Sequence, residues 1–268
     1  MLQTTIMTPM SLEGRGLHTG KPAKITFLPA KENTGINFFL KDETIPASAE
    51  FVSSTQRGVC LTKNKKTIKV VEHVLAALSG LRISNINIEL SEEELPSTDG
   101  SALPFVKKLL EAGIKKQTLE QKIVEVSSII IVENGNKKIK VLPAKNFQVS
   151  FFIEFPIIGI QTYKYNESKN NFIKEIAPAR TFGYENEVEE LKKRGLALGA
   201  NLENALAIGE KGYINQPRFE NEPVRHKILD LIGDLMLSGY HIKGHFMAER
   251  SGHKLNIELA KKLKERIQ

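Results

Sequence analysis

The order of helical and extended segments is the feature that most limits the fold of this chain. Helices are expected at residues 70–80 and 224–239, where apolar residues recur every three or four positions and a glycine follows. Residues 85–90 after the first helix alternate like a half-buried strand. Groups of strands and helices recur in both halves without regular β-α-β alternation, which favours two α+β domains over one doubly wound sheet.

Shorter segments extend this assignment along the chain. The patterns predict strands at 123–132, 138–142 and 148–155, and helices at 102–112, about 186–194 and 255–263. The polar tract 115–122 is the best candidate for a linker, so we expect domains at 1–118 and 119–268. A distant duplication fits this order, although the sequence shows no repeat of fixed period.

Composition limits the kind of protein and the kind of metal site. Hydrophobic residues make up 41% and charged residues 26%, as in ordinary soluble globular proteins. The only cysteine, Cys60, excludes an internal disulfide and the multi-thiolate zinc sites of fingers and ribbons. Any metal must therefore be held by imidazole and carboxylate groups.

The net charge of +7 is spread over short, separated basic runs, which is typical of a lysine-rich solvated surface. Attraction to an anionic substrate or membrane surface stays open. Nucleic-acid binding is disfavoured, because no aromatic residues alternate with the basic ones. We expect no signal peptide, because the N-terminus lacks a basic region followed by an apolar stretch. We also expect no transmembrane segment, because no window of about 18 apolar residues is found. We therefore expect a cytoplasmic protein.

The first candidate for chemistry is the pair Glu72-His73 inside the first long helix. Neighbouring helical residues differ by about 100° around the axis, so both side chains can border one cavity from different angles. His73 could then bind a metal while Glu72 acts on the attacking water. Taken alone, such a pair is more typical of a helix surface or a satisfied core residue.

The second candidate is His226 with Asp230, four residues apart on the second long helix. This spacing places both side chains on one face, as when a helix supplies two ligands to one ion. A surface ion pair is the commoner explanation, but Asp234 continues the same face one turn later. Three polar residues in register on a helix rich in Ile and Leu indicate a shared polar site.

A third histidine, His253, follows a glycine in what reads as a loop. Together the candidates provide two histidines, one carboxylate ligand, a carboxylate base and an additional histidine. This set matches a catalytic zinc site with one position left for water. A peptidase is disfavoured, because no His-Glu-x-x-His sequence is present.

These residues lie in blocks that resemble one family over nearly the whole chain: the zinc-dependent UDP-3-O-acyl-N-acetylglucosamine deacetylases of lipid A biosynthesis. The blocks occur in the family's order, at residues 14–20, 71–81, 96–106, 179–183, 194–199, 224–235 and 251–253. No single block decides the match, but their ordered co-occurrence is specific. The chain departs from the family's usual pattern at Pro223, at Glu203 and in the segment 55–58.

The resemblance implies two similar α+β domains with helices between two sheets, each domain carrying a small insert, and an active site at the interdomain cleft. It implies that Zn²⁺ is held by His73, His226 and Asp230 and that Glu72 is the general base. By position, His253 matches the cationic acid, Asp234 orients it, and the Thr181 hydroxyl faces the tetrahedral intermediate.

The resemblance also implies an acylated UDP-sugar substrate, from which an N-acetyl group is released as acetate. Lys227 matches a substrate-contacting lysine, and Arg250 is a second candidate for the diphosphate. An insert at about 182–210 is expected to line the acyl chain, with candidate residues Phe182, Val188, Ala197 and Leu202. We expect a monomer and leave peripheral contact with the inner membrane open. The alternative is a non-catalytic protein that binds sugar nucleotides or anionic lipids.

Overall fold

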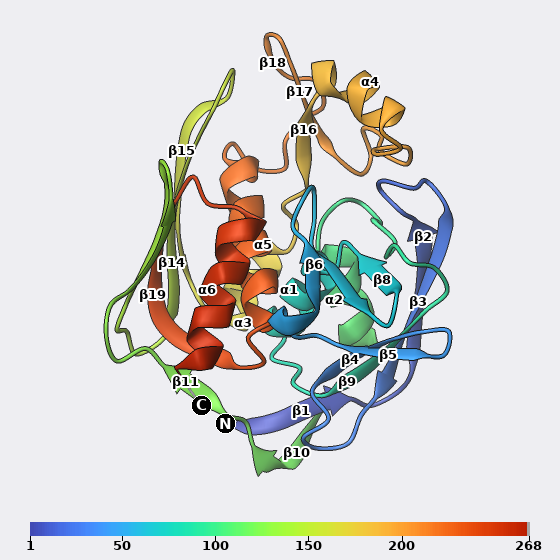
Figure 1. Ribbon diagram of the computed structural model, residues 1–268, viewed down its shortest axis with the longest axis vertical. Coiled ribbons are helices and arrows are strands. Elements are labelled where there is room, and N and C mark those ends of the chain that lie inside the picture. Colours follow the sequence, from blue (N-terminus) through green and yellow to red (C-terminus); the bar gives the residue numbers. More distant parts are fainter. Residues whose placement is uncertain (267–268) are drawn as a thin grey trace.

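The computed structural model describes residues 1–266 and confirms the expected α+β class. Two sheets form the outer layers, and the helices α1 (Glu72–Gly80), α2 (Leu103–Glu111), α5 (Glu222–Met236) and α6 (His253–Glu265) lie between them (Figure 1). A single hydrophobic core contains residues from both halves of the chain.

The sheet of the N-terminal half has five strands in the order β2-β3-β9-β4-β5. Its central strand β9 (Ile86–Leu90) runs antiparallel to β3 (Pro22–Pro29) and parallel to β4 (Ile36–Leu40). The edges are β2 (Met10–Arg15) and β5 (Glu43–Pro46). Burial alternates along β3, as expected for a sheet with one face on the core.

The sheet of the C-terminal half repeats this order as β12-β13-β19-β14-β15. Its central strand β19 (His241–Glu249) is antiparallel to β13 (Lys137–Leu142) and parallel to β14 (Phe147–Phe155). The edges are β12 (Ile130–Asn134) and β15 (Gly159–Asn166), and β11 (Ile123–Glu125) pairs with the start of β19. The two halves therefore share one topology, although no repeat is visible in the sequence.

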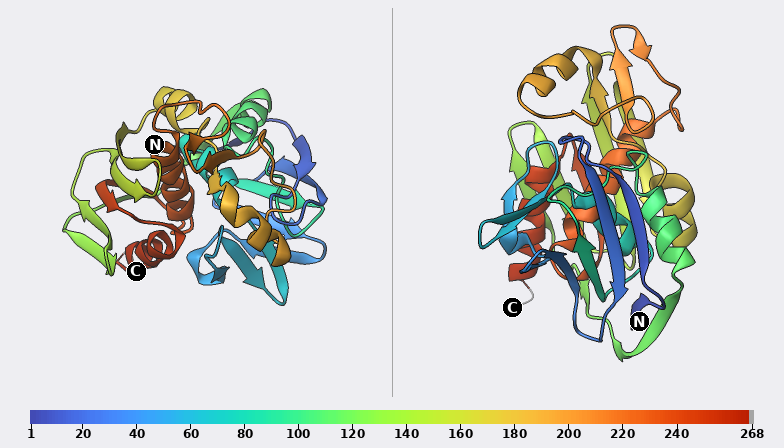
Figure 2. Two further views of the ribbon diagram at one scale, coloured as in Figure 1. Left: turned by 90° about the horizontal axis from the view of Figure 1, so that it is seen from above. Right: turned by 90° about the vertical axis from the view of Figure 1, so that its right-hand side faces the viewer.

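Each half also carries a small insert between its second hairpin and the helix that follows. The first contains β6 (Val52–Ser54), β7 (Cys60–Lys63) and β8 (Lys66–Lys69), after the short helix η1 (Ala49–Phe51). The second contains β16 (Phe182–Tyr184), α4 (Glu185–Lys193), β17 (Leu206–Gly209) and β18 (Gly212–Tyr213). It follows α3 (Lys169–Asn171) and η2 (Phe172–Ile176) and lies beyond the N-terminal end of α5 (Figures 1 and 2).

Three expected segments differ from the structure. The tract 115–122, expected as a linker, lies mostly in β10 (Ile114–Glu120), which pairs antiparallel with β1 (Leu2–Ile6). The single strand expected at 123–132 is divided into β11 and β12. His253, expected in a loop, is the first residue of α6, with Gly252 at the N-cap.

The helices expected from apolar periodicity are all present, with ends shifted by at most three residues. α1 differs from an ordinary amphipathic helix, because all nine of its residues are buried between its neighbours. No helix within residues 1–266 is both long enough and apolar enough to cross a membrane.

Candidate active site

The site forms where the N-terminal end of α1 packs closely against α5. Gly233 permits this approach: a Cβ atom there would lie 2.1 Å from the backbone oxygen of Glu72. The contact places His73, at the start of α1, beside His226 and Asp230 on α5. Residues about 150 positions apart in the sequence thus reach one site.

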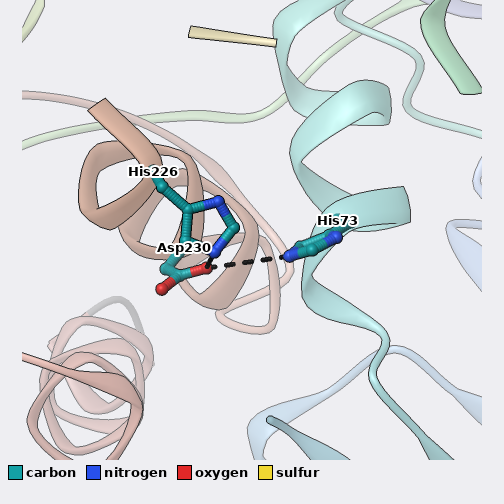
Figure 3. Close-up of side chains that lie close together, drawn as sticks. All are labelled: His73, His226 and Asp230. Atoms are coloured by element: carbon teal, nitrogen blue, oxygen red, sulfur yellow. Dashed lines mark ion pairs between the residues drawn. The ribbon is translucent and has the colours of Figure 1, made fainter. Parts of the chain in front are cut away.

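Three of the predicted side chains converge in a buried cluster (Figure 3). His226 Nε2 lies 3.2 Å and His73 Nε2 lies 4.0 Å from Asp230 Oδ1. The two imidazole rings meet edge to face, with centroids 5.1 Å apart. Their ligand atoms all lie within 4.8 Å of one another, and none of the three residues is more than 6% exposed.

The chemistry of this cluster fits a divalent cation. Asp230 Oδ1 is buried and accepts no hydrogen bond, which is costly for a carboxylate without a cation. His226 Nδ1 donates to the Ala179 carbonyl at 3.1 Å, so its Nε2 keeps a free lone pair. Burial lowers the pKa of His73 to about 3 and lowers that of His226, so both imidazoles stay neutral. Neutral imidazole and carboxylate are the ligands of catalytic zinc sites.

The carboxylate of Asp230 stays charged although it is buried. Burial alone would raise its pKa, but His226, Lys227 and His253 together hold the pKa well below its ordinary value. The Lys227 ammonium lies 2.7 Å from Asp230 Oδ2, whereas His73 and His226 approach the other carboxylate oxygen, Oδ1. Lys227 therefore compensates part of the buried charge.

Glu72 lies beside the cluster, in a position suited to exchanging a proton. Its Oε2 accepts a hydrogen bond from the Val59 amide at 3.0 Å, and its Oε1 is 3.7 Å from His253 Nε2. Gly58 closes over the same carboxylate: its φ is +136°, and a Cβ there would meet Oε1 at 3.0 Å. Burial raises the pKa of Glu72 to about 7, near the optimum for a general base at neutral pH.

His253 is held as a cation by two carboxylates. Its Nδ1 donates to Asp234 Oδ2 at 2.8 Å, and the same oxygen accepts from Asn256 at 2.9 Å. Burial opposes a charge on the ring, but Asp234 and Asp230 outweigh it and raise the pKa of His253 to about 10. Sequence reasoning missed Asn256, whose only signal is its position one turn after His253 at the start of α6.

Three other residues predicted from the sequence are Phe182, Thr181 and Arg250. Phe182 lies beside the cluster, with its ring 6.2 Å from that of His226 and the Lys227 ammonium 5.8 Å from its centroid. Thr181 immediately precedes it and donates its backbone N–H to Gly100. The Arg250 guanidinium pairs with the partly exposed Glu154 carboxylate.

The predicted acyl-binding residues lie in the second insert. Val188 is half-buried in α4, and Ala197 is buried in the loop between α4 and β17. Leu202 lies in the same loop with 53% of its surface exposed. The insert contacts the N-terminal half of the chain: Gly199 donates its backbone N–H to the Leu17 carbonyl, and its α-carbon lies against the 16–20 turn.

Comparison with known proteins identifies the family of this chain. A family model described as UDP-3-O-acyl N-acetylglycosamine deacetylase matches residues 3–265. The chain belongs to this family. A UDP-3-O-acyl-N-acetylglucosamine deacetylase of Thermodesulfovibrio yellowstonii is 41% identical over 98% of this chain and 92% of its own length. Those of Campylobacter hominis and Syntrophotalea carbinolica are 42% and 40% identical over 97% of this chain, and over 90% and 87% of their lengths. The resemblance found in the sequence is thereby confirmed.

Proposed function

We propose that this deacetylase hydrolyses the N-acetyl amide of UDP-3-O-acyl-N-acetylglucosamine, releasing acetate, in lipid A biosynthesis. The observation that carries the proposal is one buried site that combines a His-His-Asp cluster, a carboxylate with a raised pKa and a cationic histidine. Membership of the family and the names of its relatives support the substrate.

We propose zinc as the cofactor, held by His73, His226 and Asp230. A bound zinc ion supplies Lewis acidity, which polarises the amide carbonyl and lowers the pKa of water towards about 7. The buried, unpaired Asp230 oxygen and the two neutral imidazoles support this assignment.

The remaining side chains would handle the protons. Glu72 takes a proton from water as the water oxygen bonds to the carbonyl carbon. The His253 cation, held by Asp234, stabilises the negative oxygen, helped by the Thr181 hydroxyl. His253 then gives its proton to the amine nitrogen as the C–N bond breaks. The products are acetate and the free amine of the sugar.

We propose that Lys227 and Arg250 meet the anionic diphosphate and that the second insert holds the acyl chain. Phe182 begins this insert and lies beside the metal cluster, which supports a path for the acyl chain past Phe182 towards Val188, Ala197 and Leu202. We keep the division into domains at 1–118 and 119–268 as a proposal, supported by the two sheets of equal strand order. We also propose that the chain acts as a monomer.

Acetate release from the acylated UDP-sugar tests the reaction, measured before chelation, after it and after zinc is returned. We expect activity to vanish and then recover. Glu72→Gln keeps the size of the side chain but removes the base, so kcat should fall by about 10²–10⁴ while zinc content stays the same. Glu111→Gln, on the exposed side of α2, is the matched control. Undiminished release by Glu72→Gln would contradict the mechanism, and binding without any release would favour a non-catalytic binding protein.

A further inference from the structure

A buried ion pair joins the start of α5 to the segment that precedes β16. Glu222 is fully buried and Arg180 is 6% exposed. Glu222 Oε1 accepts hydrogen bonds from the backbone N–H and the Nε of Arg180, both at 2.9 Å. Its Oε2 accepts from Arg180 Nη2 at 3.1 Å and from the Arg218 backbone N–H at 2.6 Å. Both carboxylate oxygens are therefore satisfied, which a buried charge requires.

The pair is connected to the proposed metal site through one peptide group. The backbone N–H of Arg180 and the carbonyl of Ala179 belong to the same planar unit. The N–H donates to Glu222, and the carbonyl accepts from His226 Nδ1 at 3.1 Å. Glu222 and His226 are four residues apart on α5, so one helix holds both ends of this peptide unit.

We propose that Arg180 and Glu222 are positioning residues that fix the orientation of His226. By holding the 179–180 peptide, they keep the Ala179 carbonyl against Nδ1, which must then carry the proton. His226 Nε2 is left as the unprotonated nitrogen that faces Asp230 and His73. Outer groups that hold a metal-bound histidine typically change metal affinity when they are lost. The inference rests on the proposed function, because it takes His226 as a metal ligand.

Stability alone does not explain the arrangement. A buried ion pair adds little stability over apolar residues of the same volume. Here the carboxylate binds a backbone N–H in addition to the guanidinium, and that N–H belongs to the peptide that contacts His226. The side chain of Arg180 also donates a hydrogen bond to the Gln216 carbonyl at 2.8 Å, which further restricts the position of the guanidinium.

The test is the zinc affinity of the full chain, measured by competition with a chelator. Glu222→Gln replaces one acceptor oxygen by an amide NH2 group. This group cannot accept the hydrogen bonds from the Arg218 N–H and the Arg180 guanidinium. We expect the Kd for zinc to rise by about 10–100-fold. At saturating zinc, kcat should fall by a smaller factor, because the bound ion then holds the imidazole. Glu167→Gln is the matched control: it breaks the Arg82–Glu167 pair, 3.0 Å long, and should leave zinc affinity unchanged.

Each outcome decides the proposal. A folded Glu222→Gln variant with wild-type zinc affinity would overturn it, as would an equal loss in Glu167→Gln. If Glu222→Gln does not fold, Arg180→Lys is the deciding variant. It keeps the backbone N–H and the positive charge, but it loses the contact that Arg180 makes to Glu222 through both Nε and Nη2. It should raise the Kd about 10-fold, and an unchanged Kd would overturn the inference. A wild-type protein that binds no zinc would instead refute the proposed function itself.

Discussion

At the residue scale, two groups in the site have pKa values displaced towards catalytic use. Burial raises the pKa of Glu72 to about 7, and neighbouring carboxylates raise that of His253 to about 10 despite its burial. The proposed mechanism needs Glu72 deprotonated and His253 protonated. Activity should therefore rise as pH increases through the pKa of Glu72 and fall as pH increases through that of His253. A bound divalent cation lowers both values and moves this window to lower pH.

Substitution of Asp234 tests the high-pH side of this window. Asp234→Asn removes the largest favourable charge on His253, so the pKa of His253 should fall. The protonated form is then lost at lower pH, and the fall in kcat/KM should move to lower pH while the rise set by Glu72 changes less. A pH profile of acetate release measures both sides. An unmoved high-pH side would show that His253 is not the group responsible.

Sequence reasoning at this scale found residues that act through their own side chains. His226 and Asp230 were recognisable because a helix places residues four apart on one face. Ala179 was not recognisable, because it contributes a backbone carbonyl that any residue would have. Asn256 and Glu222 were missed because their partners are set by tertiary packing, 22 and 42 residues away.

At the element scale, both helices that carry the site follow an insert, in the same topological position of each half. α1 comes after β6–β8, and α5 comes after the unit of β16–β18 and α4. The periodicity of α1 and α5 was visible because it is local. The pairing of β10 with β1 was not visible, because the paired strands lie more than 100 residues apart and β10 is mostly polar.

The close contact between α1 and α5 makes a prediction about Gly233. In Gly233→Ala, the new Cβ would lie 2.1 Å from backbone oxygen of Glu72, so the helices must separate. Overpacking of this kind costs about 1–3 kcal/mol. We expect a lower free energy of unfolding, measured in urea, and weaker zinc binding, because His73 moves away from Asp230.

Gly183→Ala is the control for stability, because a Cβ at Gly183 meets no atom within 4 Å. It should leave the free energy of unfolding nearly unchanged. If Gly233→Ala were as stable as the wild type and bound zinc equally well, the close helix contact would not be what brings the ligands together.

At the scale of the whole molecule, the proposed metal ligands come from both halves of the chain. His73 belongs to the N-terminal half, and His226 and Asp230 belong to the C-terminal half. One hydrophobic core also spans both halves. The halves should therefore unfold together, and a metal bound between them should stabilise the whole molecule.

Metal removal tests this coupling. A ligand present at 100 times its Kd stabilises the folded state by about 2.7 kcal/mol, so chelation should lower the urea midpoint of a single transition. His73→Ala removes the only ligand from the N-terminal half, and its midpoint should no longer respond to chelation. His245→Ala, which loses a hydrogen bond to Ser150 on β14, should keep the full response. Two separate transitions, or a chelation response that persists in His73→Ala, would mean that the metal does not join the two halves.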